Sequence, residues 1–269
     1  MNDGTANIAP ETWHYGIVAQ FWAEFRREGP EIAYFQRRVE QHGQPALDVA
    51  CGTGRLLLPM LRAGLDVDGC DLSADMLGHC RAAAEREGLS PRLYEQAMHA
   101  LDLPRVYRTI FVCGGFGLGG DREQDGDALL RMRRHLAPGG ALVFDHHLPY
   151  ADATQWSYWV EEKRRGLPEA PLPLGPGQRT SDGSEIAMQA RIIALDPLEQ
   201  VVTLAMRAER RRDGHVVAEE ERVLKIRHYF RNELLLMLER AGFRQVDVEA
   251  DYAEGPPRPE SKVLILTAR

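Results

Sequence analysis

The chain has 269 residues, 44% of them hydrophobic, and a formal net charge of −7 at pH 7. This length and composition suffice for one large folded domain, or for one domain with an insertion. The negative charge argues against nucleic acid as a substrate, and no apolar run reaches the about 18 residues that a membrane-spanning helix needs. Residues 1–4 lack the pattern of a secretory signal, and the four cysteines lack metal-ligand spacing. We therefore expect a cytoplasmic protein with reduced thiols, no metal site and no membrane partner.

Apolar and aromatic residues at helical spacing predict helices over residues 11–42, interrupted at Gly29-Pro30. Strands and helices then alternate along the chain. The predicted strands are 46–50, 66–70, 92–96, 108–113 and 141–144, and the predicted helices are 54–63, 74–87 and 123–136. Such alternation is typical of a parallel sheet with helices on both faces.

The pattern changes after the fifth strand. Residues 166–177 are rich in Gly and Pro, and three β-like segments follow at 184–195, 199–211 and 215–227, with the hairpin signal Asp213-Gly214 between the last two. A helix at 232–240 and strands near 243–250 and 262–268 then resume the α/β pattern. We expect a helical N-terminal lid (1–42), a ligand-binding core (43–150), an antiparallel insertion for substrate or oligomer contacts (151–227) and a return to the core (228–269).

The segment Ala46–Arg55 carries the most information about a ligand. A predicted strand ends there in Gly52-Thr53-Gly54, and glycines allow a sharp turn and a close approach of the backbone to a ligand. Asp71 ends the next strand, where a carboxylate can accept hydrogen bonds from both ribose hydroxyls of a nucleoside. Leu57 replaces the third glycine of a dinucleotide fingerprint, and Asp48 would repel a pyrophosphate. Both features argue against NAD, whereas Asp48 suits the ammonium group of S-adenosylmethionine (SAM).

Three motifs in order, Leu47–Gly54, Asp71–Leu77 and Leu136–Gly140, resemble the class I SAM-dependent methyltransferases over roughly residues 40–150. The resemblance implies a doubly wound, Rossmann-like α/β fold with a seven-stranded sheet, an N-terminal helical lid and an antiparallel β insertion after strand five. It also implies SAM as the cofactor. The aromatic N-terminal helix and the insertion are similar to those of glycine N-methyltransferase and of the aminosugar N-methyltransferases of antibiotic pathways.

Ligands of doubly wound sheets bind beyond the carboxyl ends of the strands, and this rule together with the resemblance selects the cofactor residues. By resemblance Leu72 and Met76 pack on adenine, and Tyr15 is an aromatic residue that covers the cofactor. Ala97 stands where many relatives carry an acidic residue, so we expect adenine recognition through backbone groups, apolar packing and Gln96. The candidates are Tyr15, Asp48, Ala50, Cys51, Gly52, Gly54, Asp71, Leu72, Met76, Gln96, Ala97, Met98 and Cys113.

The acceptor is expected near Asp145, His146 and His147, which follow the fifth predicted strand. A histidine whose pKa lies near neutrality can remove a proton from a nucleophile. A catalytic base, a positioning role and a structural role all remain open for these residues. We assign His99 to the surface and Trp22 to the core. Further acceptor candidates, each with a structural alternative, are Phe116, His228 and Tyr229.

The sequence thus predicts a SAM-dependent methyltransferase that modifies nitrogen or oxygen of a small molecule, as in secondary metabolism, and that could dimerise through its insertion. Two alternatives stay open. One is an NAD(P)-dependent Rossmann oxidoreductase, which the Leu57 and Asp48 positions disfavour. The other is a SAM-binding protein without transfer activity.

Overall fold

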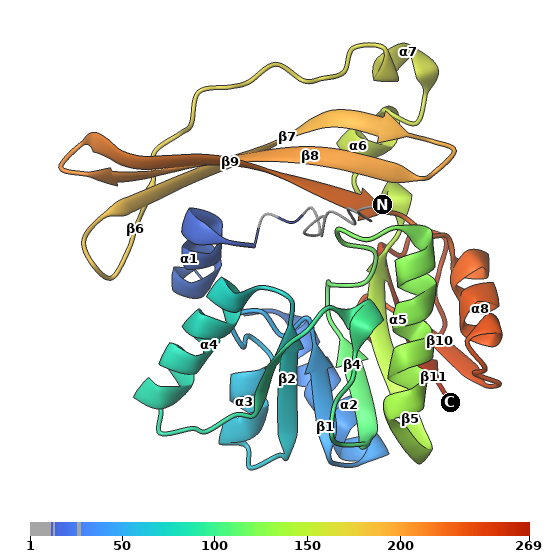
Figure 1. Cartoon of the computed structure of the whole chain (residues 1–269). Coiled ribbons are helices and arrows are strands. Elements are labelled where there is room, and N and C mark those ends of the chain that lie inside the picture. The colour runs from blue at the N-terminus through green and yellow to red at the C-terminus, as the bar shows by residue number, and fades with distance from the viewer. Residues whose placement is uncertain (1–11, 13, 26–27) are drawn as a thin grey trace, which may run out of the picture.

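Two sheets organise the chain in the computed structural model, which describes residue 12, residues 14–25 and residues 28–269. A seven-stranded sheet forms the core, and a four-stranded antiparallel sheet lies across one end of it (Figure 1). Residues 1–4, and positions 11, 13, 26 and 27 of the predicted helical segment 11–42, lie outside the described residues.

The core sheet has the order β10-β11-β5-β4-β1-β2-β3. Strands β1 to β5 pair in parallel, whereas β11 is antiparallel to both β5 and β10. The chain moves outward from β1 in one direction through β2 and β3, and from β4 in the other, so the switch point lies between β1 and β4. This confirms the predicted Rossmann-like sheet. Its strands are β1 (Ala46–Val49), β2 (Val67–Asp71), β3 (Leu93–Glu95), β4 (Tyr107–Val112), β5 (Leu136–His147), β10 (Val246–Ala250) and β11 (Val263–Ala268).

Helices cover both faces of this sheet. On one face Phe35 and Leu57 pack with Phe111 of β4, and on the other Leu129 and Leu234 join the opposite side chains of the strands. Because both faces are covered, a ligand can reach the sheet only at the ends of its strands. The first face carries α2 (Pro30–His42), α3 (Leu57–Arg62) and α4 (Ala74–Arg86), and the second carries α5 (Arg122–His135) and α8 (Arg231–Arg240).

The predicted insertion is an antiparallel sheet, and α1 (Gly16–Glu24) lies between it and the core in Figure 1. Ile17 and Val18 of α1 share an apolar cluster with Met206 and Leu224 of that sheet. Positive φ angles at the Asp213-Gly214 turn agree with the hairpin signal. Short elements that the sequence analysis did not predict are β6 and two helices that precede it. The elements are α6 (Ala153–Ser157), α7 (Glu161–Arg164), β6 (Gln178–Arg179), β7 (Glu185–Asp196), β8 (Val201–Arg212) and β9 (His215–Arg227).

Strand β5 is longer than the predicted 141–144, and this boundary was wrong. Its outer end pairs with β11 in the register His147↔Val263, and its start pairs with β4 at Leu136↔Tyr107. Asp145, expected beyond the strand, is therefore a ladder residue opposite Ile265, as are His146 and His147 opposite their own β11 partners. In the described part of the chain, no helix combines the length and apolar character needed to cross a bilayer.

Candidate active site

The β1–α3 loop turns back sharply through residues with positive φ, namely Ala50, Gly52 and Gly54. Gly52 and Gly54 have different roles. Gly52 lines a cavity at the end of the core sheet. A Cβ at Gly54 would lie 2.6 Å from Cys80 Sγ, so this glycine lets the loop pack on α4, and it does not line the cavity.

Asp71, at the end of β2, holds this loop in place through hydrogen bonds to the backbone. Its Oδ2 accepts a hydrogen bond from the Gly52 N–H at 2.8 Å, and its Oδ1 accepts one from the Ser73 N–H at 2.8 Å. Burial raises the pKa of Asp71, while the N–H donors of Ser73 and Gly52 oppose that shift. A carboxylate has about four acceptor positions, so Asp71 keeps acceptor capacity for a ligand hydroxyl beside its backbone donors.

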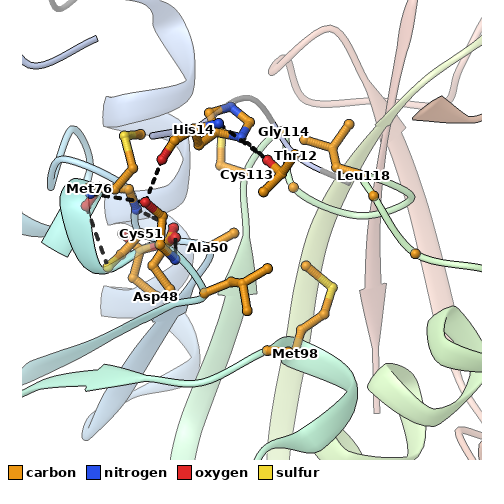
Figure 2. A pocket seen from close by; sticks show the side chains of 18 of the residues that line it. Thr12, His14, Asp48, Ala50, Cys51, Met76, Met98, Cys113, Gly114 and Leu118 are labelled. Carbon is orange, nitrogen blue, oxygen red and sulfur yellow. Dashed lines mark hydrogen bonds between the residues drawn. The ribbon is translucent and has the colours of Figure 1, made fainter. Parts of the chain in front are cut away.

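A cavity of about 490 Å³ opens at the carboxyl ends of β1, β2 and β4, within the range typical of small-molecule sites. Figure 2 shows Met76 of α4 and Met98 on opposite sides of it. Among the predicted cofactor residues, Tyr15 and Gly54 do not line this cavity. Those that do are Asp48, Ala50, Cys51, Gly52, Asp71, Leu72, Met76, Gln96, Ala97, Met98 and Cys113.

Gln96 is already engaged by neighbouring backbone. Its side-chain amide donates to Asp102 O at 3.2 Å and accepts from Asp102 N at 2.9 Å. At this strand end the cavity wall is therefore formed by backbone groups and by the apolar side chains of Ala97 and Met98. The next residue, His99, was predicted at the surface. That prediction was wrong, because His99 is half-buried and lines the cavity.

Carboxylates dominate the charge of the cavity. Asp48 is 3% exposed, and burial raises its pKa well above the ordinary range. No hydrogen bond from a described residue reaches its carboxylate. Arg55 also lines the cavity, pairs with Glu31 and donates to Cys113 Sγ at 3.5 Å. The cavity thus presents a guanidinium at Arg55 and, at Asp48, a carboxylate that accepts no hydrogen bond from the described residues, and this pair suits the two ends of an amino acid.

The N-terminal segment covers the cavity. Ser73 Oγ donates to the carbonyl of His14, and Gly16 N donates to Asp75 Oδ2 at 2.7 Å, so the segment is held on α4. On the other side Val18 N donates to Glu220 Oε1 of the insertion at 3.0 Å. Three described residues of this region, Thr12, His14 and Trp22, line the cavity.

Two aromatic side chains of the N-terminal segment, Tyr15 and Trp22, do not lie where the sequence analysis placed them. Tyr15 stands beside the cavity lining, with the Arg222 guanidinium 5.7 Å from its ring centroid. Burial raises the pKa of Tyr15, and the charge of Asp71 adds to that shift. Trp22, assigned to the core from sequence, is 37% exposed and faces the cavity, so that assignment was wrong.

Asp145, His146 and His147 do not line the cavity. Asp145 accepts hydrogen bonds from Gly114 N and from the Tyr252 hydroxyl, both at 2.5 Å, and so supports the loop after β4 from behind. His146 is buried, its Nε2 accepts from Tyr229 N at 2.9 Å, and burial lowers its pKa to about 3. His147 is exposed. The alternation of β5 thus separates these side chains, as the strand geometry predicts.

The other acceptor candidates form a layer behind the cavity wall. Phe116 and His146 both pack on the ring of Tyr229, with centroids 5.9 Å and 5.6 Å away. His228 is buried, with its Nε2 2.7 Å from Gln155 Nε2. The Tyr229 hydroxyl extends further and donates to Asp125 Oδ2 at 2.7 Å. Asp125 lines the cavity.

Sequence reasoning missed Asp125. It lies in the acidic start of α5, and no local signal distinguishes it from the exposed Asp127 two positions later.

The insertion contributes directly to the cavity. The glycine-rich loop after β4 is hydrogen-bonded to β9, an edge strand of the insertion. Gly119 N donates to Lys225 O, and Arg227 N donates to Gly117 O, both at 2.8 Å. Leu224 and Ile226 of β9 line the cavity beside this loop. One cavity therefore joins the β1–α3 loop of the core to the antiparallel sheet.

Comparison with known proteins shows which family this part of the chain resembles. Residues 46–140, which contain the β1–α3 loop, Asp71 and Asp125, match the family model described as a methyltransferase domain. Over these residues the chain is similar to the methyltransferase domain, in agreement with the resemblance seen in its three sequence motifs.

Named relatives of this chain include two from Streptomyces. The dTDP-3-amino-3,6-dideoxy-alpha-D-glucopyranose N,N-dimethyltransferase of Streptomyces fradiae is 30% identical over 156 residues, which are 54% of this chain and 59% of that protein. The dTDP-3-amino-3,4,6-trideoxy-alpha-D-glucopyranose N,N-dimethyltransferase of Streptomyces venezuelae is 29% identical over 176 residues, 65% of this chain and 71% of that protein. The chain spans 58% and 59% of the length of the first two curated relatives that it matches.

Solved structures share the fold. The sugar N-methyltransferase of a Streptoalloteichus species superposes with a TM-score of 0.68 at 20% identity, covering 100% of this chain and 99% of that one. The CcbJ methyltransferase of Streptomyces caelestis gives 0.68 at 21% identity, covering 95% and 99%. At this identity the likeness concerns the fold, including the insertion.

The residues of this cavity fit SAM. Gly52 provides a cradle that a Cβ would crowd against Met76 Cε at 3.1 Å. Asp48 has a buried carboxylate in need of a cation, and Arg55 offers a partner for a carboxylate. Asp71 lies where a ribose would meet it. Within the described residues, no three His, Cys, Asp or Glu side chains gather as a metal site.

Proposed function

We propose that this protein is a methyltransferase that binds SAM in the cavity and transfers the methyl group of SAM to an amine on a small molecule, a nucleotide-linked aminosugar of secondary metabolism. One observation carries the proposal: a single cavity is lined both by the β1–α3 loop with Asp71 and by Leu224 and Ile226 of the insertion. Two ligands can therefore meet in it. The aminosugar is supported by the names of the two Streptomyces relatives.

Methyl transfer needs little acid chemistry, because SAM supplies an activated methyl group on a sulfonium that leaves readily. What remains for the protein is to orient two reactants and to exclude water, which can lower a barrier by about 7–11 kcal/mol in favourable cases. Gly52 and Asp71 would fix the cofactor side. His14 and Trp22 would close the cavity over it, and Leu224 would keep the acceptor side dry.

The proposal assigns a separate role to each part of the chain. Residues 1–42 act as the lid, 43–150 and 228–269 as the SAM-binding core, and 151–227 as the region that contacts substrate. We extend the proposal to a homodimer formed through the insertion, where Leu198, Val216 and Val217 are exposed. The buried thiols of Cys51 and Cys70 fit a cytoplasmic location.

Asp145, His146 and His147 remain candidates for turnover. The contacts described above favour a positioning role: Asp145 holds Gly114 at the cavity wall, and His146 holds Tyr229 N. Replacing each histidine with asparagine tests the alternative of a catalytic base. A loss of kcat of about 10²-fold with unchanged affinity for S-adenosylhomocysteine would identify one of them as the base.

Two measurements test the proposed function. Calorimetry should show binding of S-adenosylhomocysteine and none of NAD; the reverse result would establish the oxidoreductase alternative. Mass spectrometry should then show a gain of one or two methyl groups on a nucleotide-linked 3-aminosugar incubated with SAM. The matching 3-hydroxy sugar is the control. Binding of S-adenosylhomocysteine without any methylated product would favour a SAM-binding protein that does not transfer.

A further inference from the structure

Asp125 is a buried carboxylate on the acceptor side of the cavity. The residue is 3% exposed and lines the cavity together with Gly120 and Gln124. Its Oδ2 accepts the 2.7 Å hydrogen bond from the Tyr229 hydroxyl. Its Oδ1 lies against Gly120, where a Cβ would approach it to 3.4 Å, and no side-chain hydrogen bond from a described residue reaches it. One carboxylate oxygen is thus fixed, and the other remains available.

The surroundings leave the charge of Asp125 without a direct counterion. Among the described residues no Lys, Arg or His forms a salt bridge with it, although the positive charge of Arg227 acts on it from β9. Asp121 on α5 acts in the opposite sense, and His99 faces the same cavity from the turn that packs on α5. Burial raises the pKa of Asp125 to about 6, against the lowering effects of Tyr229 and Arg227. Above that pH it is an anion facing a largely apolar wall.

We propose that Asp125 binds the acceptor as an ammonium ion through Oδ1 and accepts one of its protons. The N–H bond of the ammonium breaks, an O–H bond to Asp125 forms, and the nitrogen regains the lone pair that it needs to act as a nucleophile. The proton leaves to solvent when the product departs. An alcohol can also donate a hydrogen bond to the carboxylate, but it brings no positive charge to offset the buried negative one, so the site selects amines over hydroxyl compounds. This inference rests on the proposed function and specifies its acceptor class.

The neighbouring residues make the selection physically reasonable. Both an ammonium and a hydroxyl can donate a hydrogen bond to the carboxylate, but only the ammonium adds a full positive charge opposite it, and the low dielectric of a buried site strengthens that attraction. Leu118, Leu224 and Ile226 line the same part of the cavity and offer no competing polar partner. The Tyr229 hydroxyl, held in place by the contact of its backbone N–H with His146, orients the carboxylate.

The test uses cyclohexylammonium and cyclohexanol, two probes with a ring of sugar size that differ in the charged group. The full-length protein is first saturated with S-adenosylhomocysteine; failure of that step would refute the proposed function itself. NMR titration at pH 8 should then show at least tenfold tighter binding of the amine. Asp125→Asn should abolish the preference, whereas Asp127→Asn, an exposed neighbour on the same helix, should retain it. Equal binding of both probes, no binding of either, or a preference that survives in Asp125→Asn would overturn the inference.

A second variant separates this role from a purely structural one. The amine preference of the wild type should fall as the pH drops through about 6, because protonation of Asp125 removes the negative charge while an alkylammonium stays protonated. Tyr229→Phe removes the donor that lowers the pKa of Asp125, so the midpoint should move to higher pH. A midpoint that is unchanged in Tyr229→Phe, or a preference independent of pH, would show that Asp125 is not the group responsible.

Discussion

Replacing Asp71 with alanine should weaken the binding of S-adenosylhomocysteine without unfolding the protein. The carboxylate ends β2 and faces the cavity, where two ribose hydroxyls can donate to it. It also accepts hydrogen bonds from Gly52 N and Ser73 N. The substitution therefore removes both the contact with the ligand and the hydrogen bonds that hold the β1–α3 loop and Ser73 in place.

The expected magnitude follows from those contacts. A hydrogen bond to a charged group contributes about 1.5–3 kcal/mol, so even one effective ribose contact exceeds the about 1.4 kcal/mol that corresponds to a tenfold change in affinity. We expect a loss of tenfold or more. In the unliganded protein, water can reach the two released N–H groups of Gly52 and Ser73, so we expect a loss of folding stability of only about 1 kcal/mol.

Calorimetry with two ligands distinguishes the ribose contact from the loop brace. Wild type and Asp71→Ala are each titrated with S-adenosylhomocysteine and with its 2′-deoxyribose analogue. If the carboxylate binds the ribose, the deoxy analogue binds more weakly to wild type, and this difference shrinks in the variant. If it only braces the loop, Asp71→Ala weakens both ligands equally.

The reasoning fails if folded Asp71→Ala binds S-adenosylhomocysteine as tightly as wild type does. Thermal unfolding of the same samples provides the control for folding. Asp71→Asn is a useful companion, because an amide has only one acceptor oxygen and must turn its NH₂ group toward either Gly52 N or Ser73 N. We expect it to bind no better than the alanine variant.

Three further predictions concern the cavity, the loop and β5. Asp48→Asn should weaken S-adenosylhomocysteine about tenfold but leave 5′-methylthioadenosine, which lacks the amino acid, unaffected; equal loss for both ligands would place Asp48 away from the ammonium. Gly54→Ala should lower the melting temperature more than Gly64→Ala, since both glycines have positive φ but only at Gly54 would a Cβ meet Cys80 Sγ, at 2.6 Å; the overpacking adds about 1–3 kcal/mol, and equal losses would contradict it. His146 has its folded-state pKa lowered to about 3 by burial, so the unfolded chain binds the extra proton first and stability should fall as pH decreases below about 6.5. Urea unfolding of His146→Asn should show a weaker decline from pH 7 to pH 5, and a decline as steep as that of wild type would assign the effect to other groups.

Some of this site follows from local sequence, because its parts come from consecutive residues at a strand end. The Gly52-Thr53-Gly54 turn and Asp71 were predictable, since a parallel sheet brings the carboxyl ends of β1 and β2 to one edge. The insertion was predictable too, because hairpin turns such as Asp213-Gly214 are set by two adjacent residues. These features depend on backbone preferences and on alternation within one segment.

Other features depend on contacts between distant segments, and only the tertiary structure decided them. Strand β5 runs on to His147 because β11, far along the chain, supplies a hydrogen-bonding partner. Gly54 serves the packing against Cys80, which a pattern of glycines does not reveal. Asp125 meets Tyr229 across 104 residues of sequence, and nothing near either residue announces that contact. Local patterns determine where a strand or a turn can form, whereas burial, which shifts the pKa of Asp125 and of His146 and fixes their partners, arises only when separate elements pack together.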